Sequence, residues 1–238
     1  MDLDITESPE VLKAWAWAEK NIKQLIIGTA VVVIGALVIG YTFWSRANQR
    51  KAAGVALADT FYAATQMTAA ESEAAYTKVA DEYRSTPAGA QARLLAAAAL
   101  FDTGKFSEAQ AAFEQFANEH FSSPLTAQAL YGKAAALSAQ GKTSEAADAY
   151  KSVVDQFPQA PLVSQARYAL ASLRAQQGDL NQAVSLYEEV ARDASRSSLG
   201  AEAALRADEL RAKLPPPVVV PTAAETNPPA VDSQSTTN

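Results

Sequence analysis

The chain has 238 residues, with 20 lysines and arginines against 26 aspartates and glutamates, for a formal net charge of −6. This length suits one or two domains, and the acidic balance argues against a general nucleic-acid binder, which shows a basic patch. The sequence has no cysteine and one histidine, which excludes disulfide scaffolds, thiol catalysis and metal motifs that need cysteines or two histidines.

The segment 1–24 carries a helix signal. Ser8, Pro9 and Glu10 form a helix start, with a capping side chain, a proline suited to the first turn and an acid near the positive end of the helix dipole. The apolar face that follows holds Val11, Trp15, Ala18 and Ile22, and the opposite face holds Lys13, Lys20 and Lys23. This pattern predicts a short amphipathic helix on a membrane surface, with Trp15 at the interface. The alternative is that this segment simply extends the next helix.

Residues 25–44 read LIIGTAVVVIGALVIGYTFW and carry no charge. As a helix these twenty residues span about 30 Å, the thickness of the hydrocarbon core of a bilayer. Tyr41, Phe43 and Trp44 at the far end suit the membrane interface. The stretch is longer than the ~7–15 apolar residues of a cleaved signal peptide. We therefore predict an uncleaved transmembrane helix, whose orientation stays open because three cations flank each side.

Beyond the apolar stretch the sequence repeats with a period of 37 residues. Three columns recur at this spacing: a glycine, a small residue and an aromatic residue. Their members are Gly104, Gly141 and Gly178; Ala109, Ala146 and Ala183; and Phe113, Tyr150 and Tyr187. Several columns at one fixed period indicate a repeat architecture.

Each repeat is predicted to form a helix hairpin. A proline should begin the first helix at its first turn, the glycine should end it in the left-handed conformation, and a polar residue should cap the second helix. The prolines are Pro87, Pro124 and Pro161, and the caps are Ser107, Ser144 and Asn181. The alanine lets the two helices approach closely, and the aromatic residue one turn later should fill the gap between hairpins.

These columns resemble the tetratricopeptide repeat over roughly residues 86–195. The family's large aromatic residue near the start of the first helix is replaced by Arg93, Leu130 or Arg167. A degenerate first unit over about 48–84 and a further first helix over 197–214 complete the array. The resemblance implies an all-α protein, in which a single N-terminal transmembrane helix precedes a TPR-like α-solenoid over residues 48–214.

The last segment, 215–238, has six prolines and two charged residues. Such a composition cannot bury a core, so we predict a disordered Pro-rich tail.

In tetratricopeptide arrays the first helices line the inner, partner-binding face, and the resemblance places seven residues there. They are Gln91, Leu94, Phe101, Gln128, Tyr131, Gln165 and Tyr168. Ala98, Ala135 and Ser172 belong to the same face. Because this surface is apolar and amide-rich with little charge, we expect it to bind an extended apolar peptide segment. The alternative is that Tyr131 and Tyr168 merely pack between helices.

Gly141, Lys142 and Thr143 match the end of a phosphate-binding loop. The first glycine of that motif is Ala136 here, and Asp179 takes the place of the lysine in the next repeat. We therefore interpret the match as a hairpin turn. With no other catalytic or metal-binding spacing in the sequence, we predict no enzyme, no cofactor and no metal.

The layout of the segment 1–24, the span 25–44 and the helical domain also resembles the ancillary subunits of the SecYEG translocon. This resemblance implies a bacterial inner-membrane protein with a periplasmic repeat domain, whose partners are the translocon, periplasmic chaperones or emerging secreted chains. Residues 150–173 resemble repeats of Tol–Pal-associated and outer-membrane-assembly proteins. The alternative function is therefore a structural scaffold for envelope assembly or division complexes.

Overall fold

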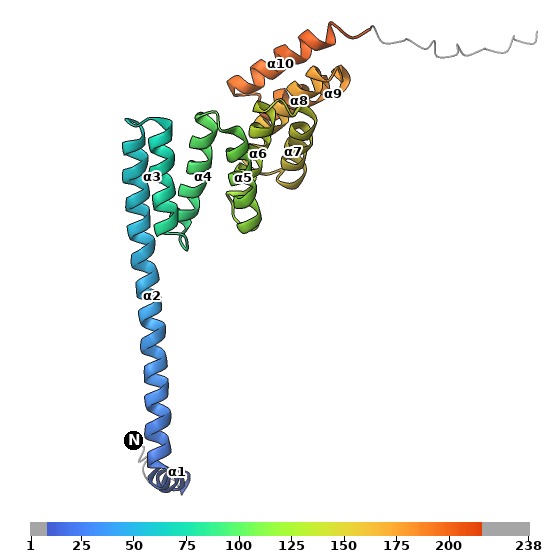
Figure 1. The fold of residues 1–238 in the computed structure, drawn as a ribbon. Coiled ribbons are helices and arrows are strands. Elements are labelled where there is room, and N and C mark those ends of the chain that lie inside the picture. Colours follow the sequence, from blue (N-terminus) through green and yellow to red (C-terminus); the bar gives the residue numbers. More distant parts are fainter. Residues whose placement is uncertain (1–8, 216–238) are drawn as a thin grey trace, which may run out of the picture. The chain divides into compact units, whose positions relative to one another are not determined.

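The computed structural model describes residues 9–215, which form ten α-helices and no strand (Figure 1). Residues 1–8 and 216–238 lie outside the described part of the chain, and with them nearly all of the predicted Pro-rich tail. The helices are α1 (Pro9–Lys20), α2 (Ile22–Ala64), α3 (Ala69–Glu82), α4 (Pro87–Asp102), α5 (Phe106–Glu119), α6 (Thr126–Ala139), α7 (Thr143–Gln156), α8 (Val163–Gln176), α9 (Leu180–Asp193) and α10 (Ser198–Arg211).

The chain divides into two compact units, residues 1–149 and 150–238. In the first unit one hydrophobic cluster joins α2, α3 and α4 around Leu57, Tyr76 and Val79. A second cluster joins α4, α5 and α6 around Phe113 and Phe116. In the second unit the core joins α8, α9 and α10. Each core therefore forms between helices that are consecutive in the chain, as expected for stacked helix hairpins.

The long helix α2 joins the apolar stretch to the first hairpin without a break. It runs 43 residues, and its apolar window is long and apolar enough to cross a membrane, with a mean hydropathy of 2.3 and none of it buried. The same helix then buries Ala53 and Leu57 against the repeat domain. The predicted boundaries at 44 and 48 therefore coincide with no break in the helix, because residues 45–52 contain no glycine or proline to end it.

The N-terminal segment does not simply extend α2. Helix α1 ends at Lys20, and Asn21 separates it from α2, with the Asn21 side-chain amide donating to the Trp17 carbonyl at 2.8 Å. The two helices run in different directions (Figure 1). Trp15 is 73% exposed on α1.

The three hairpin glycines adopt the left-handed conformation that the repeat pattern predicts. Gly104, Gly141 and Gly178 have φ of 76°, 74° and 84°. At the first of them the Gly104 amide donates to the Phe101 carbonyl at 2.9 Å, and the Lys105 amide donates to the Leu100 carbonyl at 3.0 Å. Equivalent bonds occur at the other two glycines, so each first helix ends in a Schellman motif.

The caps predicted for the second helices are wrong. Helices α5, α7 and α9 begin at positions 106, 143 and 180, one residue before Ser107, Ser144 and Asn181. Because the glycine reverses the chain within two residues, the next helix starts directly after it. In the third repeat Asp179 is the cap, and its carboxylate accepts from the Gln182 amide at 3.2 Å.

The proline prediction holds for one helix of three. Pro87 occupies the first turn of α4 behind the cap Thr86. Helices α6 and α8 begin two residues after Pro124 and Pro161. There each proline is the second residue of a β-turn, closed by the Thr126 amide on the Ser123 carbonyl at 3.1 Å and by Val163 on Ala160 at 3.0 Å. The fixed φ of proline suits this turn position as well as a helix start.

The alanine and aromatic columns are buried as predicted. Ala109, Ala146 and Ala183 have no exposed surface, and Phe113, Tyr150 and Tyr187 are at most 5% exposed. A Cβ added to Gly132 of α6 would lie 2.6 Å from the Phe113 ring. The ring therefore fills the space between the α4–α5 hairpin and the next helix.

Substituting alanine for Gly141 should lower the free energy of unfolding by about 1–2 kcal/mol, because a side chain at positive φ is strained. No atom lies within 4 Å of the added Cβ, so the backbone alone causes the loss. The matched control is Gly54→Ala in α2, which also has open space and should be neutral or stabilising by up to about 1 kcal/mol. Thermal unfolding of the full chain in detergent, followed by circular dichroism, measures both. Equal effects of the two substitutions would contradict the prediction.

Candidate functional site

The first unit has a pocket of about 230 Å³ between α4 and α6, which we call the apolar slot. Six residues predicted for the inner face line it: Leu94, Ala98, Phe101, Gln128, Tyr131 and Ala135. Leu95, Asp102, Phe113 and Gly132 complete the lining. The structure thus gathers residues from two successive first helices around one hollow. Gln91, which is exposed on α4, lies outside it.

The base of the apolar slot belongs to the hydrophobic core, and its outer part is accessible. Leu94 and Phe113 are 3% and 5% exposed and belong to the cluster that joins α4, α5 and α6. Phe101 is partly exposed, and its ring packs edge-on against Phe106 at 5.1 Å. Burial raises the pKa of the Tyr131 phenol above its usual value. An apolar hollow with few polar groups at its edge is suited to receiving an apolar side chain.

The second unit has a pocket at the same position of the repeat, of about 460 Å³, which we call the charged slot. Seven of its ten lining residues lie 74 positions, or two repeats, after lining residues of the apolar slot. The equivalent pairs include Leu94 and Tyr168, Ala98 and Ser172, Phe113 and Tyr187, Gly132 and Arg206, and Ala135 and Glu209. Small or apolar positions have thus become charged, so the two slots differ in the ligands that they suit.

Tyr168 has a packing role in the charged slot. Its ring lies 5.0 Å from that of Tyr187 in an edge-on contact, and its hydroxyl donates to Glu202 Oε1 at 2.6 Å. Burial, and then the bond to Glu202, raise the pKa of Tyr168. Tyr168 therefore connects α8 to α9 and α10 and also lines the charged slot. Gln165 is exposed on α8 and does not line the charged slot.

Arg206, Glu209 and Lys213 of α10 also line the charged slot, although none of them was predicted as a site residue. Arg206 pairs with Glu209, one turn later on α10, at 3.2 Å, and both side chains line the charged slot. Extending the 37-residue register of the inner face into α10 would have found Glu209, which follows Ala135 by two repeats.

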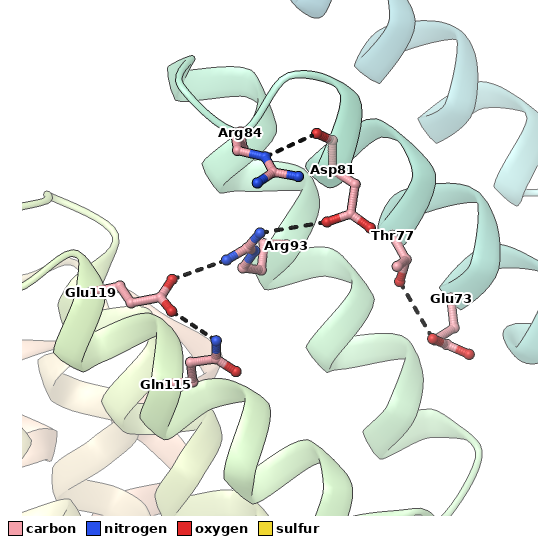
Figure 2. A network of polar contacts seen from close by, with 7 residues as sticks. All are labelled: Glu73, Thr77, Asp81, Arg84, Arg93, Gln115 and Glu119. Atoms are coloured by element: carbon pink, nitrogen blue, oxygen red, sulfur yellow. Dashed lines mark hydrogen bonds and ion pairs between the residues drawn. The ribbon is translucent and has the colours of Figure 1, made fainter.

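Arginines near the start of two first helices form ion-pair networks where the tetratricopeptide repeat usually has an aromatic residue. Figure 2 shows Arg93 between Glu119 and Asp81, with Nη–O distances of 2.9 and 3.7 Å. Gln115 donates to Glu119 at 2.7 Å, and this bond followed by the charge of Arg93 lowers the pKa of Glu119. Arg93 thereby joins α3, α4 and α5.

The equivalent arginine of the second unit makes the same kind of network. Arg167 lies 3.1 Å from Glu189 and 2.6 Å from Asp193. Its side chain is only 13% exposed. Arg167 follows Arg93 by two repeats, and Asp193 follows Glu119 by the same distance. In both units, therefore, the arginine that replaces the usual aromatic residue pairs with an acidic residue at the end of the second helix.

Gly141, Lys142 and Thr143 form the turn between α6 and α7. Their three amides donate to the carbonyls of Ser138, Leu137 and Gly141 at 2.9 to 3.0 Å. Backbone amides that are already bonded cannot hold a phosphate. Across residues 9–215 no group of three or more His, Asp or Glu side chains could hold a metal ion.

The predicted membrane-interface residues are exposed. Tyr41, Phe43 and Trp44 are 67%, 70% and 63% exposed at the end of the apolar window, with Tyr41 and Trp44 rings 6.2 Å apart.

Two stretches of the chain, residues 94–161 and 138–198, match the family model of the tetratricopeptide repeat. One similar solved structure contains nearly identical TPR-like repeats of a protein from Podosopora anserina that is described as a candidate kinesin light chain. It is 17% identical to this chain, with a TM-score of 0.51, and the match covers 70% of this chain and 86% of that chain. A single-residue variant of that protein is 18% identical, with a TM-score of 0.49 over 70% of this chain and 91% of that chain. No curated protein matches.

The chain therefore contains tetratricopeptide repeats in a TPR-like solenoid. Proteins of this kind are typically non-enzymatic scaffolds, and tetratricopeptide repeats imply a protein–protein interaction adaptor.

Proposed function

We propose that this repeat protein is a membrane-anchored adaptor without catalytic activity, which holds an extended apolar segment of a partner protein in the apolar slot. The observation that carries the proposal is the slot itself: a hollow of about 230 Å³ whose base is core and whose edge carries Phe101, Tyr131 and Gln128. Burying one large apolar side chain contributes about 1.5–3 kcal/mol.

The polar edge of the slot suits an extended backbone. The exposed amide of Gln128 offers both donors and an acceptor, as a peptide group requires. The lining also contains the acidic residue Asp102. A partner segment with an apolar side chain and no acidic residue beside it therefore fits best, because it avoids repulsion from Asp102. An unfolded or secreted chain presents such segments, which a folded protein buries.

Membrane anchoring is supported by α2. Its apolar window is wholly exposed within this chain, although an uncovered apolar helix of this length is unfavourable in water. A bilayer would cover it, with Trp15 at one interface and Tyr41, Phe43 and Trp44 at the other.

We further propose, from the resemblance to the ancillary subunits of the SecYEG translocon, that the membrane is the bacterial inner membrane, with the repeats in the periplasm and a role in protein translocation or chaperone-like handling of secreted chains. The partners would be the SecYEG translocon or periplasmic chaperones. Co-purification from mild detergent tests this assignment, because recovery of translocon components supports it. Recovery of envelope-assembly or division complexes would instead establish the scaffold function, and recovery of neither would contradict both.

Replacing both Phe101 and Tyr131 by alanine should weaken peptide binding at least about ten-fold, equivalent to about 1.4 kcal/mol, because the apolar edge of the slot is lost. The probe is a fluorescein-labelled nonapeptide with leucine at alternate positions, titrated against the full chain in detergent by fluorescence anisotropy. Tyr168→Ala is the matched control, since it removes the same residue type from the charged slot. Unchanged binding by the double variant, or an equal loss in the control, would disprove the placement of the site.

A further inference from the structure

We propose that one edge of the first unit rests on anionic phospholipid headgroups. This basal edge consists of the loops 83–86 and 120–125 and the cations Arg46, Arg50 and Lys51 of α2. The inference rests on the proposed spanning role of α2 and adds a lipid contact made by the repeats themselves.

The direction of the helices places the first loop near the membrane. Helix α3 packs beside α2 and runs back along it, antiparallel to it (Figure 1). Tyr76 and Val79 of α3 share one cluster with Leu57 of α2, and Tyr83 packs against that cluster. The 14 residues of α3 extend about 21 Å. Counted back from the end of α2, this length brings the loop 83–86 opposite the turn that holds Arg50 and Lys51.

The ion-pair network of Figure 2 places the second loop beside the first. Asp81 lies in the last turn of α3, and Glu119 is the last residue of α5; both contact Arg93, at 3.7 and 2.9 Å. The ends of α3 and α5 therefore meet at one edge of the unit. The loop 120–125, which follows Glu119 directly, lies at this edge as well.

The basal edge is close to the expected membrane surface. Arg50 follows Trp44 by six residues, or about 9 Å along α2. The headgroup layer adds about 5–8 Å beyond the hydrocarbon core on each side. Long cationic side chains reach over such distances, so lipid phosphates are within their range.

The charges of this edge favour an anionic surface. Arg46, Arg50 and Lys51 form no ion pair with any residue of the described part of the chain. Arg84 adds a fourth cation, whose Nε donates to the backbone carbonyl of Asp81 at 3.4 Å. The carboxylates of Asp81 and Glu119 pair with Arg93. Glu82 is then the acidic residue at this edge that opposes its positive charge. Each basic residue near an anionic membrane surface strengthens binding to that surface about five-fold.

An exposed aromatic side chain accompanies these cations. Phe121 is 78% exposed, whereas the neighbouring His120 ring packs on Phe116 at 4.6 Å. A large aromatic ring is unfavourable in water but suits the boundary between headgroups and acyl chains. The loop 120–125 thus offers an apolar contact beside the basic one.

The test places the environment-sensitive fluorophore NBD in the loop, on Ser122→Cys, in the full chain, which has no other cysteine. The protein is reconstituted in nanodiscs of phosphatidylcholine alone or with phosphatidylglycerol. We expect higher, blue-shifted emission with the anionic lipid, and the lipid dependence should disappear in a variant with Arg50→Gln, Lys51→Gln and Arg84→Gln. NBD on Thr103→Cys, in the loop at the opposite end of α4, should not respond, and Lys105→Gln with Lys142→Gln should leave the Ser122 signal unchanged.

Two failures are distinguishable in this design. Protein that does not co-migrate with the nanodiscs would overturn the proposed membrane anchor together with the lipid contact. Protein that co-migrates while the probe at position 122 shows the same emission in both lipids would overturn the lipid contact alone. A response that survives the triple substitution would overturn the role of the basic side chains.

Discussion

Replacing Phe116 by alanine should reduce the free energy of unfolding by about 3–5 kcal/mol. Among residues 9–215, Phe116 has the largest side chain that is fully buried, with 0% exposure. It packs in the cluster that joins α4, α5 and α6. Loss of the ring leaves a cavity between three helices that no neighbouring side chain can fill without moving. Chemical denaturation of the full chain in detergent, followed by circular dichroism at 222 nm, measures the change.

Phe121→Ala is the control, because the same ring is removed five residues later from a position that is 78% exposed. Its effect should stay within about 0.5 kcal/mol. If the two alanine variants lose the same stability, the packing described for α5 is wrong. In a repeat array each hairpin is stabilised by its neighbours, so the loss at Phe116 should also affect the apolar slot, whose base is the same cluster.

A proline at Gln49 should separate the membrane window from the repeats. Gln49 lies inside α2, between Trp44 and the first buried residue, Ala53. Proline there removes a helix hydrogen bond and clashes with the preceding turn, at a cost of about 3 kcal/mol or more. Spin labels on Val38→Cys and Phe61→Cys, 23 residues apart, should give a narrow distance distribution near 35 Å in the parent chain, about 1.5 Å per residue. In the proline variant the distribution should broaden.

Gln49→Ala is the control and should keep the narrow distribution, because alanine favours helix. A broad distribution in the parent would mean that α2 is not continuous between the window and the first hairpin. A narrow distribution in the proline variant would mean that the repeats are held to the window by other contacts. Peptide binding in the apolar slot should be the same in all three chains, since the slot lies between α4 and α6.

Much of the candidate site follows from the repeat register. Leu94, Phe101, Gln128 and Tyr131 were placed on one face by their positions in the first helices, and the structure gathers them around the apolar slot. The same register placed Tyr168 on that face, yet its ring and hydroxyl are used to pack α8 against α9 and α10. This difference depends on which residue the following helix presents: Gly132 beside the apolar slot, and Arg206 beside the charged slot.

By itself the sequence determined the hairpin unit of this protein. Gly104, Gly141 and Gly178 act within six residues of their own position, so a fixed period of 37 was enough to predict the left-handed turns and the close helix pairs around Ala109 and Phe113. Only the tertiary structure decided that α2 serves both the apolar window and the first hairpin, and that Arg93 joins three helices. It also decided that equivalent slots differ in chemistry. The physical reason is range: turns and caps are set by neighbouring residues, whereas Arg93 and Glu119 are 26 residues apart and meet only after the helices have packed.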